Sequence, residues 1–121
     1  MRTLLIGLAV IAIAAPAVAQ TAELDYPKGS LGFDALVRAD YATAEAQLRA
    51  DRRVAENDPA RLINLGQVFA RTGRITEARR LFRQALQVAD VELVLADDRA
   101  MGSHDAARAA LRELRPTLAS R

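Results

Sequence analysis

The sequence predicts a mainly α fold, in which antiparallel helical hairpins stack as a short solenoid of about two and a half repeats. The dipeptide Leu31-Gly32 recurs as Leu65-Gly66, 34 residues further along. The same spacing separates two further pairs of small or apolar residues: Ala44 from Ala78, and Leu48 from Phe82. A recurrence with this period is typical of stacked helix-turn-helix units. Such units offer a surface to another molecule, so the period indicates a class of function and not a partner.

The N-terminal residues have the composition of an export signal. Arg2 gives a short cationic start, residues 4–15 form an uninterrupted apolar run, and Ala17 and Ala19 form the A-x-A pattern that a signal peptidase accepts. We therefore expect residues 1–19 to be a signal peptide that is cleaved before Gln20. The apolar run is shorter than the ~20 residues of a membrane-spanning helix, so no stable membrane anchor is expected after cleavage. The product would be exported, and periplasmic in a Gram-negative host or otherwise secreted.

Charge and cysteine content argue against several classes of function. Removing Arg2 with the signal leaves 16 of the 17 basic residues against all 15 acidic residues, so the mature chain is close to neutral. Nucleic-acid binding needs a clustered basic surface, and we expect no nucleic-acid partner. We interpret the densest group of basic residues as a solvated outer helix face: Arg71, Arg74, Arg79, Arg80 and Arg83. The sequence has no Cys, which excludes disulfides, thiolate chemistry and cysteine metal sites.

The strongest helical segment runs from Asn57 to Ala89. Asn57-Asp58-Pro59 predicts a helix start, because a side chain that caps free N–H groups precedes a proline suited to the first turn. The first helix should reach about Arg71, and Gly73 can adopt the left-handed conformation that ends a helix. Its buried stripe is Leu62, Leu65, Gly66 and Phe69.

A second helix is expected after this turn, with Thr76 as its cap. Its apolar residues share one face: Ala78, Leu81, Phe82, Ala85 and Leu86. Gly66 costs about 1 kcal/mol in a helix relative to Ala, and we interpret it as the site where the second helix approaches the first closely. Two antiparallel helices joined by a tight turn follow from this pattern.

These positions resemble the tetratricopeptide repeat family over about 32 residues. The match reads Leu62, Leu65-Gly66, Phe69, Gly73, Ala78, Phe82 and Ala85. Leu62 stands where the family usually has Trp, and Asp90 stands where it usually has Pro. The resemblance implies that the first helices of successive hairpins line a concave face, on which an extended peptide is held.

The resemblance also assigns individual residues. The peptide-binding face would comprise Ile63, Asn64, Gln67 and Arg71 in the strong repeat, and Ser30, Phe33 and Val37 in the upstream copy. Asn64 and Gln67 can pair with backbone amides, and Arg71 can bind a carboxylate; ordinary solvated side chains are the alternative interpretation. The core that defines the repeat would be Leu31, Gly32, Ala44, Leu48, Leu62, Leu65, Gly66, Phe69, Gly73, Ala78, Phe82 and Ala85.

The upstream copy is predicted to have a short first helix. Pro27 and Gly29 would disrupt a longer one, so we expect about two turns from residue 30 or 31 to Arg38. The turn is at 39–41, and the second helix ends near Glu56. Its apolar side is Ala44, Leu48 and Val54. The domains would be the signal peptide, an extended or disordered lead at 20–29, a helical domain at 30–116 and a tail at 117–121.

The third unit is partial. Ser103 is expected to cap a helix in which Ala107 and Leu111 repeat the second-helix pattern, and Pro116 is expected to end it. Read with a period of two, the segment 91–102 places Val91, Leu93 and Leu95 on one face of a strand and Glu92, Val94 and Ala96 on the other, with a turn at Asp97-Asp98. This favours a small β-hairpin, while a short helix is the alternative.

The residues give little support for catalysis. Ser103-His104-Asp105 contains the residue types of a catalytic triad, but neighbours at a helix start cannot meet in the required geometry. A single His with scattered carboxylates does not give a metal site, and no cofactor is expected. We therefore predict a non-enzymatic adaptor or scaffold that binds an unidentified protein or peptide. The alternative is a structural module that self-associates as a homodimer, since short arrays of repeats leave apolar end faces.

Overall fold

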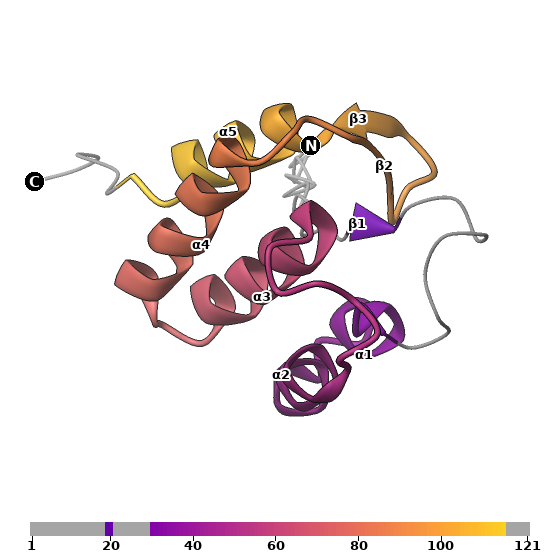
Figure 1. The fold of residues 1–121 in the computed structure, drawn as a ribbon. Coiled ribbons are helices and arrows are strands. Elements are labelled where there is room, and N and C mark those ends of the chain that lie inside the picture. Colours follow the sequence, from indigo (N-terminus) through magenta and orange to yellow (C-terminus); the bar gives the residue numbers. More distant parts are fainter. Residues whose placement is uncertain (1–18, 21–29, 116–121) are drawn as a thin grey trace, which may run out of the picture.

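The computed structural model describes residues 19–20 and 30–115. Its elements in chain order (Figure 1) are β1 (Ala19–Gln20), α1 (Phe33–Val37), α2 (Tyr41–Ala50), α3 (Pro59–Arg71), α4 (Ile75–Gln87), β2 (Glu92–Leu95), β3 (Ala100–Gly102) and α5 (Ser103–Glu113). The described part is mainly helical, as the sequence predicts, with a small antiparallel sheet beside the helices. The predicted signal peptide up to residue 18, the lead at 21–29 and the chain from Pro116 onward lie outside the described residues.

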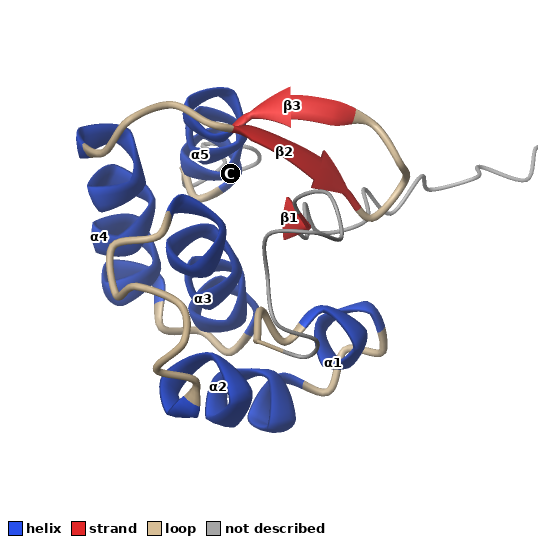
Figure 2. Ribbon diagram, turned by 45° about the vertical axis from the view of Figure 1, so that its right-hand side comes forward, coloured by secondary structure: helices blue, strands red, loops and turns tan. Residues whose placement is uncertain are grey.

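The helix α3 is the centre of the arrangement. It contacts the four other described helices and also β1. In Figures 1 and 2, α1 and α2 lie on one side of α3, while α4 and α5 lie on the other. The two sides of α3 are therefore both used for packing, which limits the surface that this helix can offer to a ligand.

The helices α3 and α4 form the hairpin that the sequence predicts. Asp58 caps α3 by accepting a backbone N–H bond of 3.1 Å from the first turn, and Pro59 is the first helical residue. Gly73 has a φ of 81°, the left-handed conformation that ends a helix. A Cβ at Gly66 would lie 2.5 Å from the Phe82 ring. This contact confirms that Gly66 permits a close approach of α4.

The residues that were predicted to define the repeat share one core. Leu65, Phe69, Ala78 and Phe82 are each at most 5% exposed and belong to a single apolar cluster. The other predicted core residues are buried as well, except for Gly73 in the exposed turn. The cluster extends into the first hairpin, the sheet and α5 through Leu36, Leu48, Leu93, Ala106 and Ala107. One continuous core thus supports all of the helices.

The first hairpin is shorter than predicted at both ends. The helix α1 begins at Phe33 and not at residue 30 or 31, because Gly32 precedes it with a left-handed φ of 61°. The helix α2 ends before Asp51 and not near Glu56. The carboxylate of Asp51 accepts bonds from the backbone N–H and the guanidinium of Arg53. These local bonds compete with helical pairing and end α2 early.

The helix α4 begins two residues earlier than predicted. Thr76 lies inside α4 and does not cap it; Arg74 occupies the cap position, with no side-chain cap bond. The left-handed turn at Gly73 lets the Arg74 carbonyl accept the first helical bond, from the N–H of Ala78 at 3.0 Å.

The side chain of Arg74 joins the two helical hairpins. Its guanidinium lies 2.6 Å from the Glu45 carboxylate of α2. The same guanidinium stacks over the Phe69 ring of α3 at 4.2 Å from the centroid. Arg49 of α2 also faces this ring, at 5.4 Å. The arginine that the sequence analysis assigned to a solvated face is therefore partly a structural contact.

Residues 91–102 form the β-hairpin that the alternating pattern favours over a short helix. The strands β2 and β3 pair antiparallel, with Leu93 opposite Met101, and Asp98 adopts a φ of 64° in the turn. Leu93 and Leu95 are buried in the core. The strand β1 pairs with the other edge of β2, so the order is β1-β2-β3 (Figure 2). The strand β1 was not predicted from the sequence.

The helix α5 packs against both α4 and α3. It begins at Ser103, so Ser103 is not the cap that the sequence analysis expected. The carboxylate of Asp90, in the loop after α4, takes this role, because it accepts the backbone N–H of His104 at 2.9 Å. Within the described residues, the hairpin replaces the first helix that a complete third unit would need.

Candidate functional site

The predicted peptide-binding face is largely buried on α3. Ile63 and Asn64 are fully buried, and Gln67 is 3% exposed. The side-chain amide of Asn64 donates a 3.0 Å bond to the carbonyl of Leu31. This bond ties α3 to the chain that leads into α1. Ile63 and Asn64 therefore support the fold, and they are not free to meet a ligand as the resemblance implied.

The upstream part of the predicted face does not form a continuous surface with α3. Phe33 is half-buried against the core, and Val37 is 57% exposed at the end of α1. Ser30 is buried, and its hydroxyl has no hydrogen-bond partner among the described residues. Phe33 and Val37 lie one turn apart on α1, whereas Ser30 precedes this helix.

A groove forms where α3, α4 and α5 meet, and it includes the remaining two predicted residues. Its volume is about 480 Å³, and it is lined by the C-terminal end of α3, the N-terminal half of α4 and the C-terminal end of α5. The lining residues are Gln67, Ala70, Arg71, Ile75, Arg79, Phe82, Ala110, Glu113 and Leu114. Gln67 and Arg71 are thus brought together, while Ile63 and Asn64 lie elsewhere.

The groove combines apolar walls with charged groups. Ile75 and Leu114 contribute exposed apolar surface, whereas Arg71 and Arg79 contribute guanidinium groups. Neither arginine lies within ion-pair distance of a carboxylate in the described part of the chain, although Glu113 lines the same groove. A guanidinium without a carboxylate partner is suited to bind one from a ligand in bidentate geometry. The apolar walls are suited to a hydrophobic side chain.

The part of this groove that α4 and α5 supply was not predicted from the sequence. Ile75 and Arg79 can be assigned to one helix from the sequence, but their proximity to Glu113 and Leu114 depends on how α5 docks. That docking is set by the hairpin at 91–102. A local pattern in the sequence does not contain this information.

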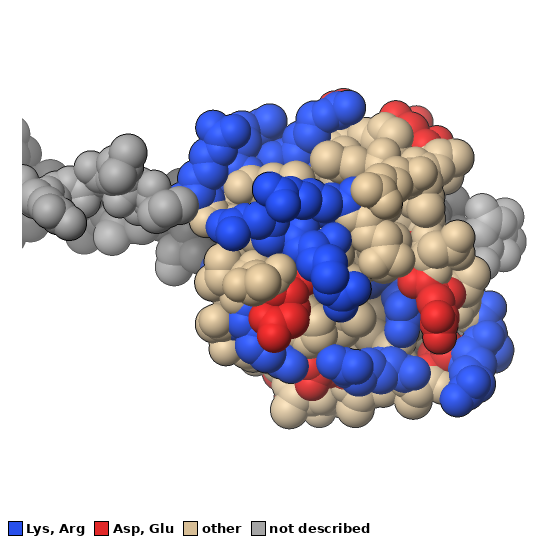
Figure 3. All heavy atoms as spheres, turned by 60° about the vertical axis from the view of Figure 1, so that its left-hand side comes forward, with Lys and Arg blue, Asp and Glu red and all other residues tan. Residues whose placement is uncertain are grey.

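A second hollow lies on the outer face of α4. Its volume is about 570 Å³, and its lining residues are Thr76, Arg79, Arg80, Arg83, Gln84 and Gln87. Figure 3 shows blue Arg atoms gathered over this side of the molecule, with few red atoms between them. Apart from Arg74, the arginines of the predicted outer face are therefore on the surface, as the sequence analysis expected, and they make this side of the molecule basic.

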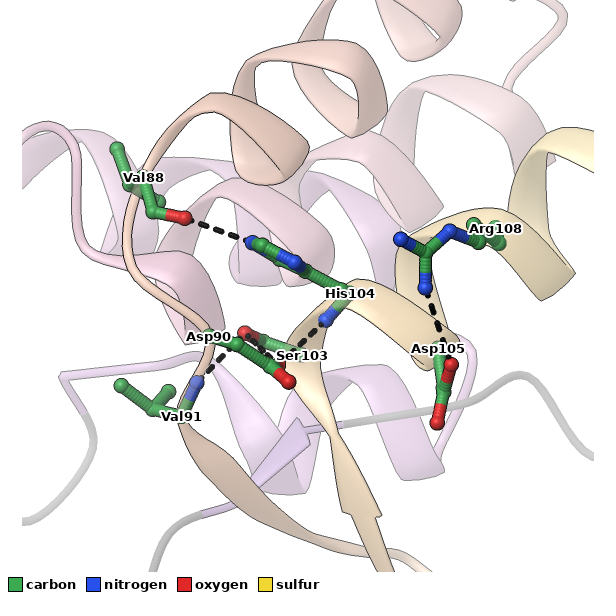
Figure 4. Close-up of polar contacts among 7 residues, drawn as sticks. All are labelled: Val88, Asp90, Val91, Ser103, His104, Asp105 and Arg108. Atoms are coloured by element: carbon green, nitrogen blue, oxygen red, sulfur yellow. Dashed lines mark hydrogen bonds and ion pairs between the residues drawn. The ribbon is translucent and has the colours of Figure 1, made fainter.

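The residues Ser103-His104-Asp105 do not form a catalytic triad. The hydroxyl of Ser103, which is fully buried, donates to Asp90 at 3.1 Å. The Nε2 of His104 donates to the carbonyl of Val88 at 2.7 Å, and Asp105 pairs with an arginine one turn along α5. Figure 4 shows the three side chains directed toward these separate partners. This confirms the geometric argument against a triad at this position.

These contacts instead fasten the start of α5 to the end of α4. Ser103 accepts the backbone N–H of Val91 at 3.0 Å while it donates to Asp90. The backbone N–H of His104, with a smaller contribution from the Ser103 hydroxyl, holds the pKa of Asp90 below its ordinary value. Hydrogen bonds to a carboxylate favour its charged form. The cluster is structural, since its bonds close on its own residues.

Two features are absent from the described residues: a cluster of metal-ligating side chains and a helix that could cross a membrane. No group of three or more His, Cys, Asp or Glu side chains is placed there to hold a metal ion. None of the helices in this part of the chain has the length and apolar character needed to cross a membrane.

Comparison with known proteins identifies no relative. No protein-family model matches the chain, and neither a curated protein nor a solved structure matches it.

Proposed function

We propose that this chain is a non-enzymatic binding module that recognises an extended segment of another protein after export. The observation that carries the proposal is the groove between α3, α4 and α5. It places Gln67 and Arg71, two residues predicted to contact a peptide, beside apolar walls and a second arginine. In this proposal the two helical hairpins act as tetratricopeptide-like repeats, supported by the 34-residue recurrence and by the contact of Gly66 with Phe82.

The groove suits a peptide that carries both an apolar and an acidic group. Its apolar walls would bury one hydrophobic side chain, which stabilises binding in proportion to the area removed from water. Arg71 and Arg79 would bind the carboxylate, which is either a side chain or the end of a peptide. A hydrogen bond to a charged group contributes about 1.5–3 kcal/mol, so these two arginines are the groups to test.

An array of short peptides that combine Leu or Phe with Asp or Glu tests this function. Binding should fall at least about tenfold when Arg71 and Arg79 are both replaced by Ala, which corresponds to about 1.4 kcal/mol. The matched control replaces Arg38 and Arg52, two exposed arginines outside the groove, and should leave binding unchanged. Equal loss in both variants, or no loss in either, would contradict the assignment of the groove.

A further inference from the structure

The strand β1 occupies an edge of β2 that would otherwise be open. Ala19 lies opposite Leu95 and Gln20 lies opposite Val94, antiparallel to β2, and β1 also contacts α3. The two paired segments lie toward opposite ends of the described chain. The strand β1 is therefore held as a separate extended peptide would be, by addition to the edge of a sheet.

The backbone groups of β2 alternate between its two neighbouring strands. The N–H of Leu95 donates to the carbonyl of Arg99 at 2.9 Å, and its carbonyl accepts the N–H of Asp98 at 3.0 Å. Leu95 therefore faces β3. In an antiparallel ladder the adjacent residue faces the other way, so the N–H and carbonyl of Val94 face β1. An edge that offers such a donor and acceptor is a template for another extended chain.

The strand β1 is a weak occupant of this edge. It has 2 residues, and pairing over so short a length is marginal. The bond between Ala19 and Gln20 is also the bond at which the sequence predicts signal cleavage. Cleavage there removes Ala19, the residue opposite Leu95, and leaves Gln20 as a chain end.

We propose that the outer edge of β2 is a strand-acceptor site, which binds an extended peptide of another protein antiparallel to β2 and which β1 fills until the signal is removed. The proposal rests on the proposed function for the class of partner, but no residue of β2 lines the groove between α3, α4 and α5. The two sites can therefore be tested separately.

The edge also defines the chemistry of the partner. The residue opposite Val94 must supply an N–H and a carbonyl, which excludes proline at that position. The residue of the bound peptide two positions further along lies opposite Glu92. The exposed carboxylate of Glu92 forms no ion pair among the described residues. Opposite charges on facing strands stabilise their pairing. The site therefore favours an extended segment with a basic side chain at that position.

The probe is a fluorescein-labelled peptide that copies residues 15–23, with Lys in place of Ala22. Its binding to the protein purified from an exporting host is measured by fluorescence anisotropy. The intact mass of that protein establishes its N-terminal residue. Val94→Pro removes the N–H that faces β1 and leaves the bonds of Leu93 and Leu95 to β3 in place. Val94→Thr keeps the N–H and is the matched control. The peptide should bind the Val94→Pro chain about tenfold more weakly than the Val94→Thr chain, because one backbone bond is lost.

A second test leaves the protein unchanged, so it remains informative if the Val94→Pro chain does not fold. The probe with Pro at the position of Gln20 should bind the natural chain at least about tenfold more weakly than the original probe, because it lacks the N–H opposite Val94. The uncleaved chain should also bind the original probe more weakly, because its tethered β1 competes at high effective concentration.

Several results would overturn the proposal. One is equal binding of the probe and its proline version. Another is loss of probe binding in the variant that lacks Arg71 and Arg79, which would place the peptide in the groove. A dimer of the cleaved chain, detected by light scattering and dissociated by Val94→Pro, would assign the edge to a second copy of this chain instead.

Discussion

Replacing Gly66 with Ala should destabilise the protein, although alanine is the better helix former. Helix propensity alone would stabilise α3 by about 1 kcal/mol. In the structure, however, the added Cβ would lie 2.5 Å from Cε1 of Phe82, and 2.9 Å from both Cδ1 and Cζ. Phe82 is 1% exposed and belongs to the apolar core, so relief requires the ring or α4 to shift against packed neighbours.

The magnitude follows from these two opposing terms. Overpacking a core costs about 1–3 kcal/mol, and three contacts with one buried ring place Gly66→Ala near the upper end of that range. Subtracting the gain in helix propensity leaves a net loss of about 2 kcal/mol. For a domain of this size, such a loss lowers the melting temperature by about 10 °C.

Urea and thermal unfolding followed by circular dichroism measure this effect. Ala46→Gly, at an exposed position inside α2, measures the propensity term in the same protein. Phe82→Leu removes the ring, so Gly66→Ala should cost less in that background than in the natural chain. If Gly66→Ala raised the stability of the natural chain by the amount that Ala46→Gly lowers it, the close packing of α3 on α4 would be refuted.

Two further predictions concern the polar contacts that hold the layers together. Asn64→Ala should cost about 2–3 kcal/mol in urea unfolding, because it leaves the buried carbonyl of Leu31 without its donor; Gln47→Ala, at an exposed position, should change little. Protonation of Asp90 should release the start of α5. Because its pKa is lowered in the folded state, its contribution is complete above about pH 4 and is lost as the pH falls through the lower folded value. Asp90→Asn should therefore flatten the acid dependence of stability, whereas parallel curves for the two proteins would contradict this role.

The helix boundaries that the sequence predicts well depend on a few adjacent residues. The cap and proline at Asp58-Pro59, the left-handed turn at Gly73 and the alternation in 91–102 each determine local structure by sterics or by a bond within one turn. The end of α2 was missed for a similar local reason. An Asp side chain is accommodated either within a helix or in a bond to neighbouring groups that ends the helix. The sequence does not show that Asp51 bonds to Arg53 and ends α2.

The candidate site was predicted less well, because its residues depend on distant neighbours. A helical wheel places Asn64 and Gln67 on one face of α3, but it does not show that Asn64 bonds to Leu31 in another hairpin. The cap of α5 was missed for the same reason, since Asp90 lies 13 residues from Ser103 and 14 from His104. The resemblance to stacked repeats implied an open face on α3, which the first hairpin and β1 partly cover.

The hairpin at 91–102 is therefore the element that shapes the proposed groove. A complete third repeat would place another long helix after α4, whereas the hairpin returns the chain to the end of α4 within a few residues. Leu93 and Leu95 anchor β2 in the core, and Asp90 and Ser103 fasten the start of α5 beside the end of α4. The helix α5 then runs back along α4, which brings Glu113 and Leu114 beside Arg79. A substitution that loosens the hairpin should consequently open the groove, even though no residue of the hairpin lines it.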